Sequence, residues 1–209
     1  MYQEYKSAWA ALTAPGADFE VITTNVRGVD IRTYANAVPN LRDAWATTAA
    51  YADREYLVYE DERLTYAQAH DRVNALGNWL IAQGVNSGDR VAIAMRNYPE
   101  WLLSYWATLS IGATVVGMNA WWTGPEMLYA LNDSEPKAII LDEERLATFN
   151  EIGQQLPTMR VVGVRLSAEQ ENVTPWQSVI ANPAPIETVA IDPDSDACIF
   201  YTSGTTGNP

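Results

Sequence analysis

The residues best suited to chemistry lie at the end of the chain, at positions 201–209. Six of these nine residues are glycine, serine or threonine, and they continue the apolar run 197–201, which is typical of a buried strand. Glycines let the backbone approach a ligand closely. Successive backbone N–H groups in such a turn bind anions, and the threonine and serine hydroxyls add donors. A polyphosphate is the ligand that this composition suits best.

Composition and spacing alone leave a second interpretation open. A flexible linker rich in serine, glycine and threonine would have the same composition. The segment is not a Walker A loop, because Gly204 and Gly207 are three positions apart and no Gly-Lys-Ser/Thr follows. It also lacks the Gly-x-Gly-x-x-Gly pattern of dinucleotide folds. The spacing therefore does not decide between a phosphate loop and a linker.

Upstream of this segment, short apolar runs alternate with helical patterns. Strands are expected at residues 91–95, 114–118, 137–141, 160–166 and 197–201. Helices are expected to begin near Leu41, Thr65, Pro99, Thr123 and Glu143, with a short hairpin at residues 56–66. Strands that alternate with helices form βαβ units. The predicted fold class is therefore α/β, with a mostly parallel sheet and helices on both faces.

Two of the helix starts have the spacing of a capping box. Thr65 with Gln68, and Thr123 with Glu126, can each satisfy two backbone N–H groups that the first helical turn leaves unpaired. Gly84 is a predicted helix end, because glycine adopts the left-handed conformation that often follows a last turn.

The chain is expected to have two parts. Residues 1–40 show little sustained periodicity and are interpreted as an N-terminal arm that wraps the main body. Residues 41–209 are interpreted as the α/β domain. Within that domain, residues 167–194 are rich in proline and asparagine and are expected to be mainly connection.

The charge balance argues against two classes of partner. With 13 basic and 26 acidic residues the net charge is −13, which opposes binding to nucleic acids or anionic membranes. The single cysteine, Cys198, excludes an internal disulfide and favours a reducing compartment. No apolar run approaches the roughly 20 residues that span a bilayer. The first residues lack a secretory signal pattern, so a cytoplasmic location is expected.

No catalytic residue or metal ligand is predicted from residue types. The only histidine, His70, has no ligating partner at metal-site spacing, so a structural or solvated role is expected. Three aspartates before the last apolar run are more typical of turns than of a metal site: Asp192, Asp194 and Asp196. Trp121 and Trp122 could line an acyl channel or a subunit contact, or pack under the helix that follows.

Tyr-Thr-Ser-Gly-Thr-Thr-Gly-Asn-Pro at 201–209 closely resembles the ATP-phosphate signature of the adenylate-forming superfamily. This superfamily contains acyl-CoA synthetases, luciferases and peptide-synthetase adenylation domains. The likeness extends over roughly residues 40–209. The upstream segments that carry it are residues 64–66, 88–92, 97–101, 112–119 and 123–131, and Asp142 with Arg145.

The resemblance implies a two-step reaction. A carboxylate attacks the α-phosphate of MgATP, giving an acyl-adenylate and pyrophosphate, and the thiol of CoA then displaces AMP. The segment would hold the β- and γ-phosphates. ATP, Mg²⁺ and CoA are the implied cofactors. The positions that the resemblance assigns to ATP binding are Thr202, Ser203, Gly204, Thr205, Thr206 and Gly207.

Within the superfamily the chain is more similar to acid–CoA ligases than to peptide-synthetase domains. A fatty acid is the expected substrate, and the alternative is an aromatic-acid CoA ligase or another adenylating enzyme. A hypothesis from a different class is a non-catalytic α/β binding or assembly domain with a flexible tail. That hypothesis does not explain the upstream likeness.

The family pattern continues with lysine and glycine after the proline, whereas this sequence stops at Pro209. We therefore expect an N-terminal fragment, truncated in the ATP-phosphate loop, with no ligase activity by itself. Sheet surfaces that later segments would cover tend to self-associate, so a homodimer or poor solubility of the isolated piece is expected.

Overall fold

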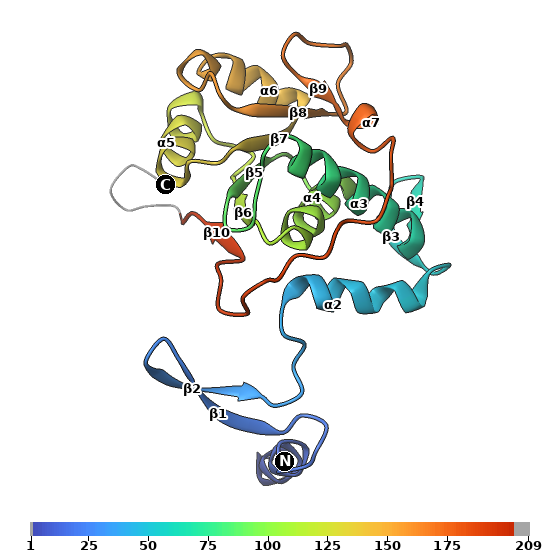
Figure 1. The fold of residues 1–209 in the computed structure, drawn as a ribbon, viewed down its shortest axis with the longest axis vertical. Helices are drawn as coiled ribbons and strands as arrows, with labels where there is room; N and C mark the ends of the chain where they lie inside the picture. The colour runs from blue at the N-terminus through green and yellow to red at the C-terminus, as the bar shows by residue number, and fades with distance from the viewer. Residues whose placement is uncertain (1, 203–209) are drawn as a thin grey trace. The chain divides into compact units, whose positions relative to one another are not determined.

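The computed structural model describes residues 2–202 of the protein. Its contacts divide the chain into two compact units, residues 1–40 and residues 41–209 (Figure 1). The larger unit contains a six-stranded sheet and the helices that cover it. The α/β class predicted from the sequence is confirmed.

The six strands are parallel and lie in the order β10-β6-β5-β7-β8-β9. Their bounds are β5 Arg90–Ala94, β6 Thr114–Gly117, β7 Ala138–Asp142, β8 Arg160–Val164, β9 Thr174–Pro175 and β10 Cys198–Phe200. The last strand is shorter than predicted, because only Cys198–Phe200 pairs with β6. β9 and the short helix α7 (Trp176–Val179) lie in the stretch that was expected to be mainly connection.

Different helices bury the two faces of the sheet (Figure 1). Successive side chains of a strand point to opposite faces. Val91 and Ile93 of β5 therefore pack with α3 and α4, whereas Ala92 and Ala94 pack with α5 and α6. The four helices are α3 Tyr66–Ala82, α4 Pro99–Ser110, α5 Gly124–Ser134 and α6 Glu143–Asn150. This burial on both faces explains why β5 is apolar at consecutive positions.

Both predicted capping boxes form. The Gln68 backbone N–H donates to the Thr65 hydroxyl at 3.3 Å, and the Thr65 N–H donates to the Gln68 amide oxygen at 2.9 Å. At the start of α5 the Thr123 N–H donates to the Glu126 carboxylate at 2.8 Å. The hydrogen bonds that the Thr123 N–H and hydroxyl donate to Glu126 lower the pKa of its carboxyl, because they stabilise the ionised form. Local sequence therefore sets where these helices begin.

Residues 180–197 cross the outer side of α3 and α4 before they enter β10 (Figure 1). The Asn78 amide donates to the Ala184 carbonyl at 2.5 Å, and the Ile186 side chain packs against Gly77. The Thr114 hydroxyl donates to the Asp196 carbonyl at 2.9 Å, just before β10. This connection brings a distant part of the chain back to the edge of the sheet at β6.

An aromatic cluster joins α2 (Leu41–Thr47), α3 and α4, and it includes the only histidine. The His70 ring stacks on Trp45 with centroids 4.2 Å apart, and its Nε2 lies 2.9 Å from the Thr48 hydroxyl. Trp45 also stacks on Trp106 at 5.1 Å. The remaining elements of this unit are the 3₁₀ helix η1 Thr48–Tyr51 and the hairpin β3 Glu55–Tyr59 with β4 Glu62–Thr65.

The smaller unit contains helix α1 (Tyr2–Leu12) and an antiparallel hairpin of β1 (Val21–Val26) and β2 (Val29–Tyr34). These elements were not predicted, because the sequence pattern there is weakly periodic. None of the described residues in this unit is buried. Over residues 2–202, helices long and apolar enough to cross a bilayer are absent.

The environment of His70 gives the protein a defined pH dependence. Burial of the ring lowers the His70 pKa below its ordinary value of 6.5, although Asp71 opposes this shift. The unfolded chain therefore binds more protons than the folded one below pH 6.5, and the free energy of unfolding falls as the pH drops through that value. In urea denaturation between pH 5 and 8, His70→Phe should show a weaker pH dependence than the wild type. Equal pH dependence would contradict this prediction.

Two glycines with positive φ give a matched pair of stability tests. Gly84 (φ +86°) has open space around an added Cβ, whereas at Gly112 (φ +74°) a Cβ would lie 2.6 Å from the Ser87 Oγ. Gly84→Ala should cost about 1–2 kcal/mol from backbone strain. Gly112→Ala should cost about 1–3 kcal/mol more, because Ser87 must move as well. Chemical denaturation measures both, and equal losses would contradict the packing argument.

Candidate functional site

The carboxyl ends of the parallel strands meet at one edge of the sheet, where open α/β sheets bind their ligands. β10 is parallel to β6, with Phe200 opposite Gly117, so the chain leaves β10 at this edge. Of the residues assigned to ATP binding, the structure describes Thr202, which is exposed just beyond the strand. The other five lie outside the described residues: Ser203, Gly204, Thr205, Thr206 and Gly207.

The point where β10 ends is held on both faces of the sheet. On one face the Phe200 ring covers Gly117, where an added Cβ would lie 2.6 Å from the ring. On the other face the Tyr201 hydroxyl donates to the Asp133 carboxylate at 2.7 Å and lies 3.1 Å from the Ala130 carbonyl oxygen. Burial, together with the bond to Asp133, raises the Tyr201 pKa to about 12. This tyrosine therefore keeps its proton at physiological pH.

A buried ion pair lies at the carboxyl end of β7. The Arg145 guanidinium contacts both oxygens of Asp142, at 3.1 and 3.2 Å, and the two side chains are 6% and 5% exposed. Asp142 also accepts from the Arg96 backbone N–H at 2.9 Å, after β5. Arg145 donates to the Ala120 carbonyl at 2.7 Å, after β6. One pair thus joins the end of β7 to the loops that follow β5 and β6.

These loops surround the topological switch point of the sheet. From β5 the chain moves to β6 on one side, and from β6 it crosses over to β7 on the other side. The crevice between the ends of β5 and β7 is where ligands bind in doubly wound folds. The Asp142 carboxylate and the Arg96 backbone N–H meet at this switch point.

An exposed aromatic side chain and a cation lie beside the switch point. The Arg96 guanidinium lies 4.5 Å from the centre of the Trp121 ring, and Trp121 is 72% exposed. Within residues 2–202, no carboxylate forms an ion pair with Arg96. Trp122, by contrast, packs against the sheet and meets the Tyr201 ring edge-on at 5.6 Å. The two tryptophans therefore have different roles, and Trp121 with Arg96 can contact a planar or anionic ligand.

A second arginine holds the β3–β4 hairpin to the same edge of the sheet. Arg165 follows β8 and contacts Glu62 of β4 at 2.8 and 3.0 Å, and Glu100 of α4 at 3.1 Å. Its guanidinium also lies over the Tyr98 and Tyr59 rings, at 4.7 and 5.1 Å. The hydrogen bonds from Arg165 lower the Glu62 pKa. These contacts are structural, because the Glu62 and Glu100 carboxylates are both already paired with Arg165.

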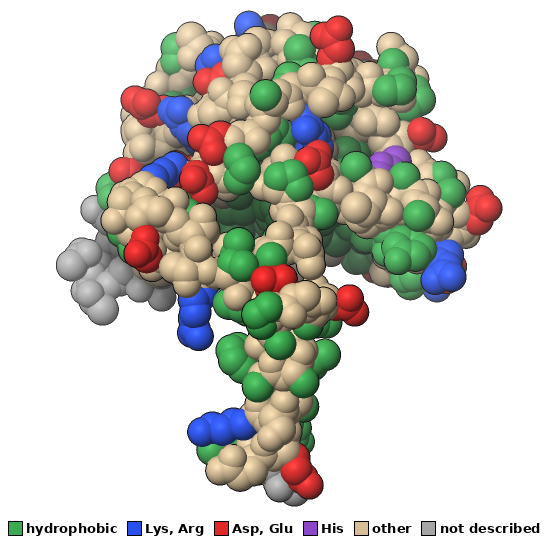
Figure 2. Space-filling view, turned by 60° about the horizontal axis from the view of Figure 1, so that its bottom comes forward, with side chains coloured by type: hydrophobic (Ala, Val, Ile, Leu, Met, Phe, Trp, Pro, Cys, Tyr) green, Lys and Arg blue, Asp and Glu red, His purple; other side chains and the backbone are tan. Residues whose placement is uncertain are grey.

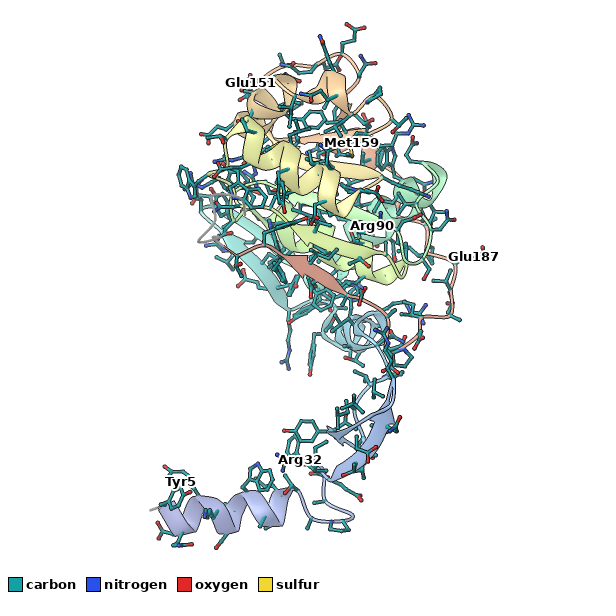
Figure 3. The ribbon with its side chains drawn as sticks, turned by 90° about the vertical axis from the view of Figure 1, so that its left-hand side faces the viewer. Tyr5, Arg32, Arg90, Glu151, Met159 and Glu187 are labelled. Carbon is teal, nitrogen blue, oxygen red and sulfur yellow. The ribbon has the colours of Figure 1, made fainter. Side chains whose placement is uncertain are left out.

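A hollow formed by described residues lies at the other edge of the sheet. It has a volume of about 480 Å³ and is lined by residues around the amino ends of β7 and β8, among them Lys137 and Met159. Met159 is labelled in Figure 3, as is Arg90 at the amino end of β5. Lys137 is already paired with Asp89 at 2.7 Å. We therefore base the candidate site on the carboxyl edge, where the predicted loop begins.

The residues for which no catalytic or metal-binding role was expected lie away from this edge or in turns. Cys198 is half-buried in β10, with its Sγ 3.4 Å from the Tyr105 hydroxyl. Asp192 accepts from the Asp194 backbone N–H at 2.9 Å within a turn. On the face shown in Figure 2, acidic and basic side chains of the described residues are interspersed. Sequence reasoning did not single out Arg96 or Arg165, although each directly follows a predicted strand or lies at its end.

Removal of Arg145 tests the importance of the buried pair. Arg145→Ala leaves Asp142 buried without its cation and should destabilise the protein by about 3–5 kcal/mol. The control is Arg63→Ala, which removes an exposed ion pair to Glu55 at 3.8 Å and should cost less than about 1 kcal/mol. Urea denaturation monitored by tryptophan fluorescence measures both. Similar losses for the two variants would show that the pair does not organise this edge.

The sequence and the fold both match known proteins. Residues 44–209 match the family described as AMP-binding enzyme. The 3-hydroxybenzoate–CoA/4-hydroxybenzoate–CoA ligase of Thauera aromatica is 33% identical over 156 residues, which cover 71% of this chain and 29% of that protein. The chain thus spans about a third of the length of such relatives.

Two solved structures show the same arrangement of strands and helices. The anthranilate CoA ligase AuaEII, solved with anthranoyl-AMP, is 27% identical and superposes with a TM-score of 0.76 over 81% of this chain and 33% of its own. Acetoacetyl-CoA synthetase from Streptomyces lividans covers 97% of this chain and 35% of its own, with a TM-score of 0.73 and 20% identity, a likeness of fold alone. Since the family match spans well over half of its residues, the chain belongs to the AMP-binding enzyme family.

Proposed function

We propose that the chain is the N-terminal part of an ATP-dependent acid–CoA ligase. The observation that carries this proposal is the position of the glycine-, serine- and threonine-rich segment, which follows β10 at the carboxyl edge of a parallel sheet. In the proposed reaction a carboxylate oxygen attacks the α-phosphorus of ATP, and pyrophosphate leaves with the electrons of the broken P–O bond. The CoA sulfur then attacks the acyl carbon, the bond to AMP breaks, and the thiol proton is released.

The loop residues are proposed to hold the β- and γ-phosphates while pyrophosphate leaves. Backbone N–H groups and hydroxyls that already point at the phosphates stabilise charge without reorganisation. These residues are Thr202, Ser203, Gly204, Thr205, Thr206 and Gly207. Among the described residues, no three histidine, cysteine or acidic side chains are placed to hold a metal ion. Mg²⁺ is proposed to enter bound to ATP.

The acid itself is the less constrained part of the proposal. A fatty acid is the substrate expected from overall likeness, whereas the Thauera ligase and AuaEII carry the names of aromatic acids. Both classes are carboxylates that the same adenylation chemistry can activate. The homodimer and the cytoplasmic location are also retained as proposals. The single cysteine supports the location.

Acid-dependent exchange of labelled pyrophosphate into ATP tests the proposed function. The full-length protein should exchange label only when a cognate carboxylic acid is present, and a panel of fatty and aromatic acids identifies the class. The isolated 209-residue chain should form no acyl-CoA. Exchange with none of the acids, or exchange independent of acid, would favour a non-catalytic binding domain.

Variants of the loop make this test specific to the proposed residues. The double change Ser203→Ala and Thr205→Ala removes two hydroxyl donors and should raise the KM for ATP by about tenfold or more. The control is Thr158→Ala, at an exposed threonine beside the amino edge of the same sheet. Equal KM values for the two variants would contradict the assignment of the phosphates to the loop.

A further inference from the structure

Tyr201 makes contacts that tie the start of the proposed phosphate loop to a neighbouring helix. Its hydroxyl donates to Asp133, in the last turn of α5, at 2.7 Å. Its ring meets Trp122, just before the first turn of α5, at a centroid distance of 5.6 Å. A single tyrosine therefore contacts residues at both ends of one helix.

The residue before it is held on the opposite face of the sheet. Neighbouring strand residues point in opposite directions, and the Phe200 ring lies against Gly117 of β6, where an added Cβ would lie 2.6 Å away. The Phe200 side chain is 64% exposed, so Tyr201 makes the more buried of the two contacts where the chain leaves β10. The residues that follow include Gly204 and Gly207, which by themselves restrict the backbone least.

We infer that Tyr201 is a positioning residue for the phosphate loop, acting through its hydrogen bond to Asp133 and its ring contact with Trp122. This inference rests on the proposed function. The Tyr201 hydroxyl is engaged by Asp133, so the proposed effect on phosphate binding is indirect. Fixing the first residue of a glycine-rich loop reduces the conformational entropy that the loop loses when it binds ATP. We expect this bond to have no effect on the affinity for CoA or for the acid.

The geometry indicates which variants separate the hydroxyl from the ring. Tyr201→Phe keeps the ring contact with Trp122 and removes the donor. Asp133→Ala removes the acceptor at an exposed position, so the buried core is untouched. Asp133→Asn keeps an acceptor oxygen and should restore the bond. The control is Tyr129→Phe, which removes a hydroxyl from a 40% exposed tyrosine of the same helix.

Steady-state kinetics and pyrophosphate exchange of the full-length ligase test the inference. Tyr201→Phe and Asp133→Ala should each raise the KM for MgATP by about three- to tenfold, with kcat and the KM values for CoA and acid within about twofold of wild type. The double variant should be no worse than Tyr201→Phe alone, because that change already removes the bond to Asp133. Asp133→Asn and Tyr129→Phe should resemble the wild type.

The outcomes distinguish this inference from the proposed function. Wild-type exchange that depends on acid, together with an unchanged KM for MgATP in Tyr201→Phe and Asp133→Ala, would overturn the inference and leave the proposed function intact. Parallel losses in kcat, thermal stability and the KM of every substrate would also overturn it, because they indicate a structural role. Absence of acid-dependent exchange in the wild type would overturn both.

Discussion

The buried pair between Asp142 and Arg145 is the interaction on which the carboxyl edge of the sheet depends. Its two charges are almost fully removed from water, and they persist there because each one is also bonded to the backbone of another loop. Asp142 holds the loop after β5 through the Arg96 N–H, and Arg145 holds the loop after β6 through the Ala120 carbonyl. Removing one partner of such a pair is costly, because the remaining charge stays buried without a counterion.

The loop after β6 links this pair to the start of the proposed phosphate loop. Ala120 accepts from Arg145, and two residues later Trp122 contacts the Tyr201 ring. The exposed Trp121 lies between them and stacks with Arg96. The start of the proposed phosphate loop and the switch point therefore both contact a single short segment, the loop after β6. A parallel sheet makes this possible, because it brings every strand end to the same edge.

How much of this arrangement the sequence could predict depends on the distance between interacting residues along the chain. The capping box of Thr65 and Gln68, and the alternation of strands and helices, follow from local patterns and were predicted. The contact from Asp142 to the Arg96 N–H joins residues 46 positions apart, and the pairing of Arg165 with Glu62 spans 103 positions. No local pattern specifies such contacts, because they arise only when the sheet forms.

The central claim is that the segment after β10 binds the triphosphate of ATP at the carboxyl edge of the sheet. A crystal structure of the full-length protein with a non-hydrolysable ATP analogue tests this claim most directly. The β- and γ-phosphates should lie within hydrogen-bond distance of the backbone N–H groups of residues 203–207, next to Thr202. A triphosphate bound elsewhere, for example in the hollow near Lys137 and Met159 at the amino edge, would contradict it.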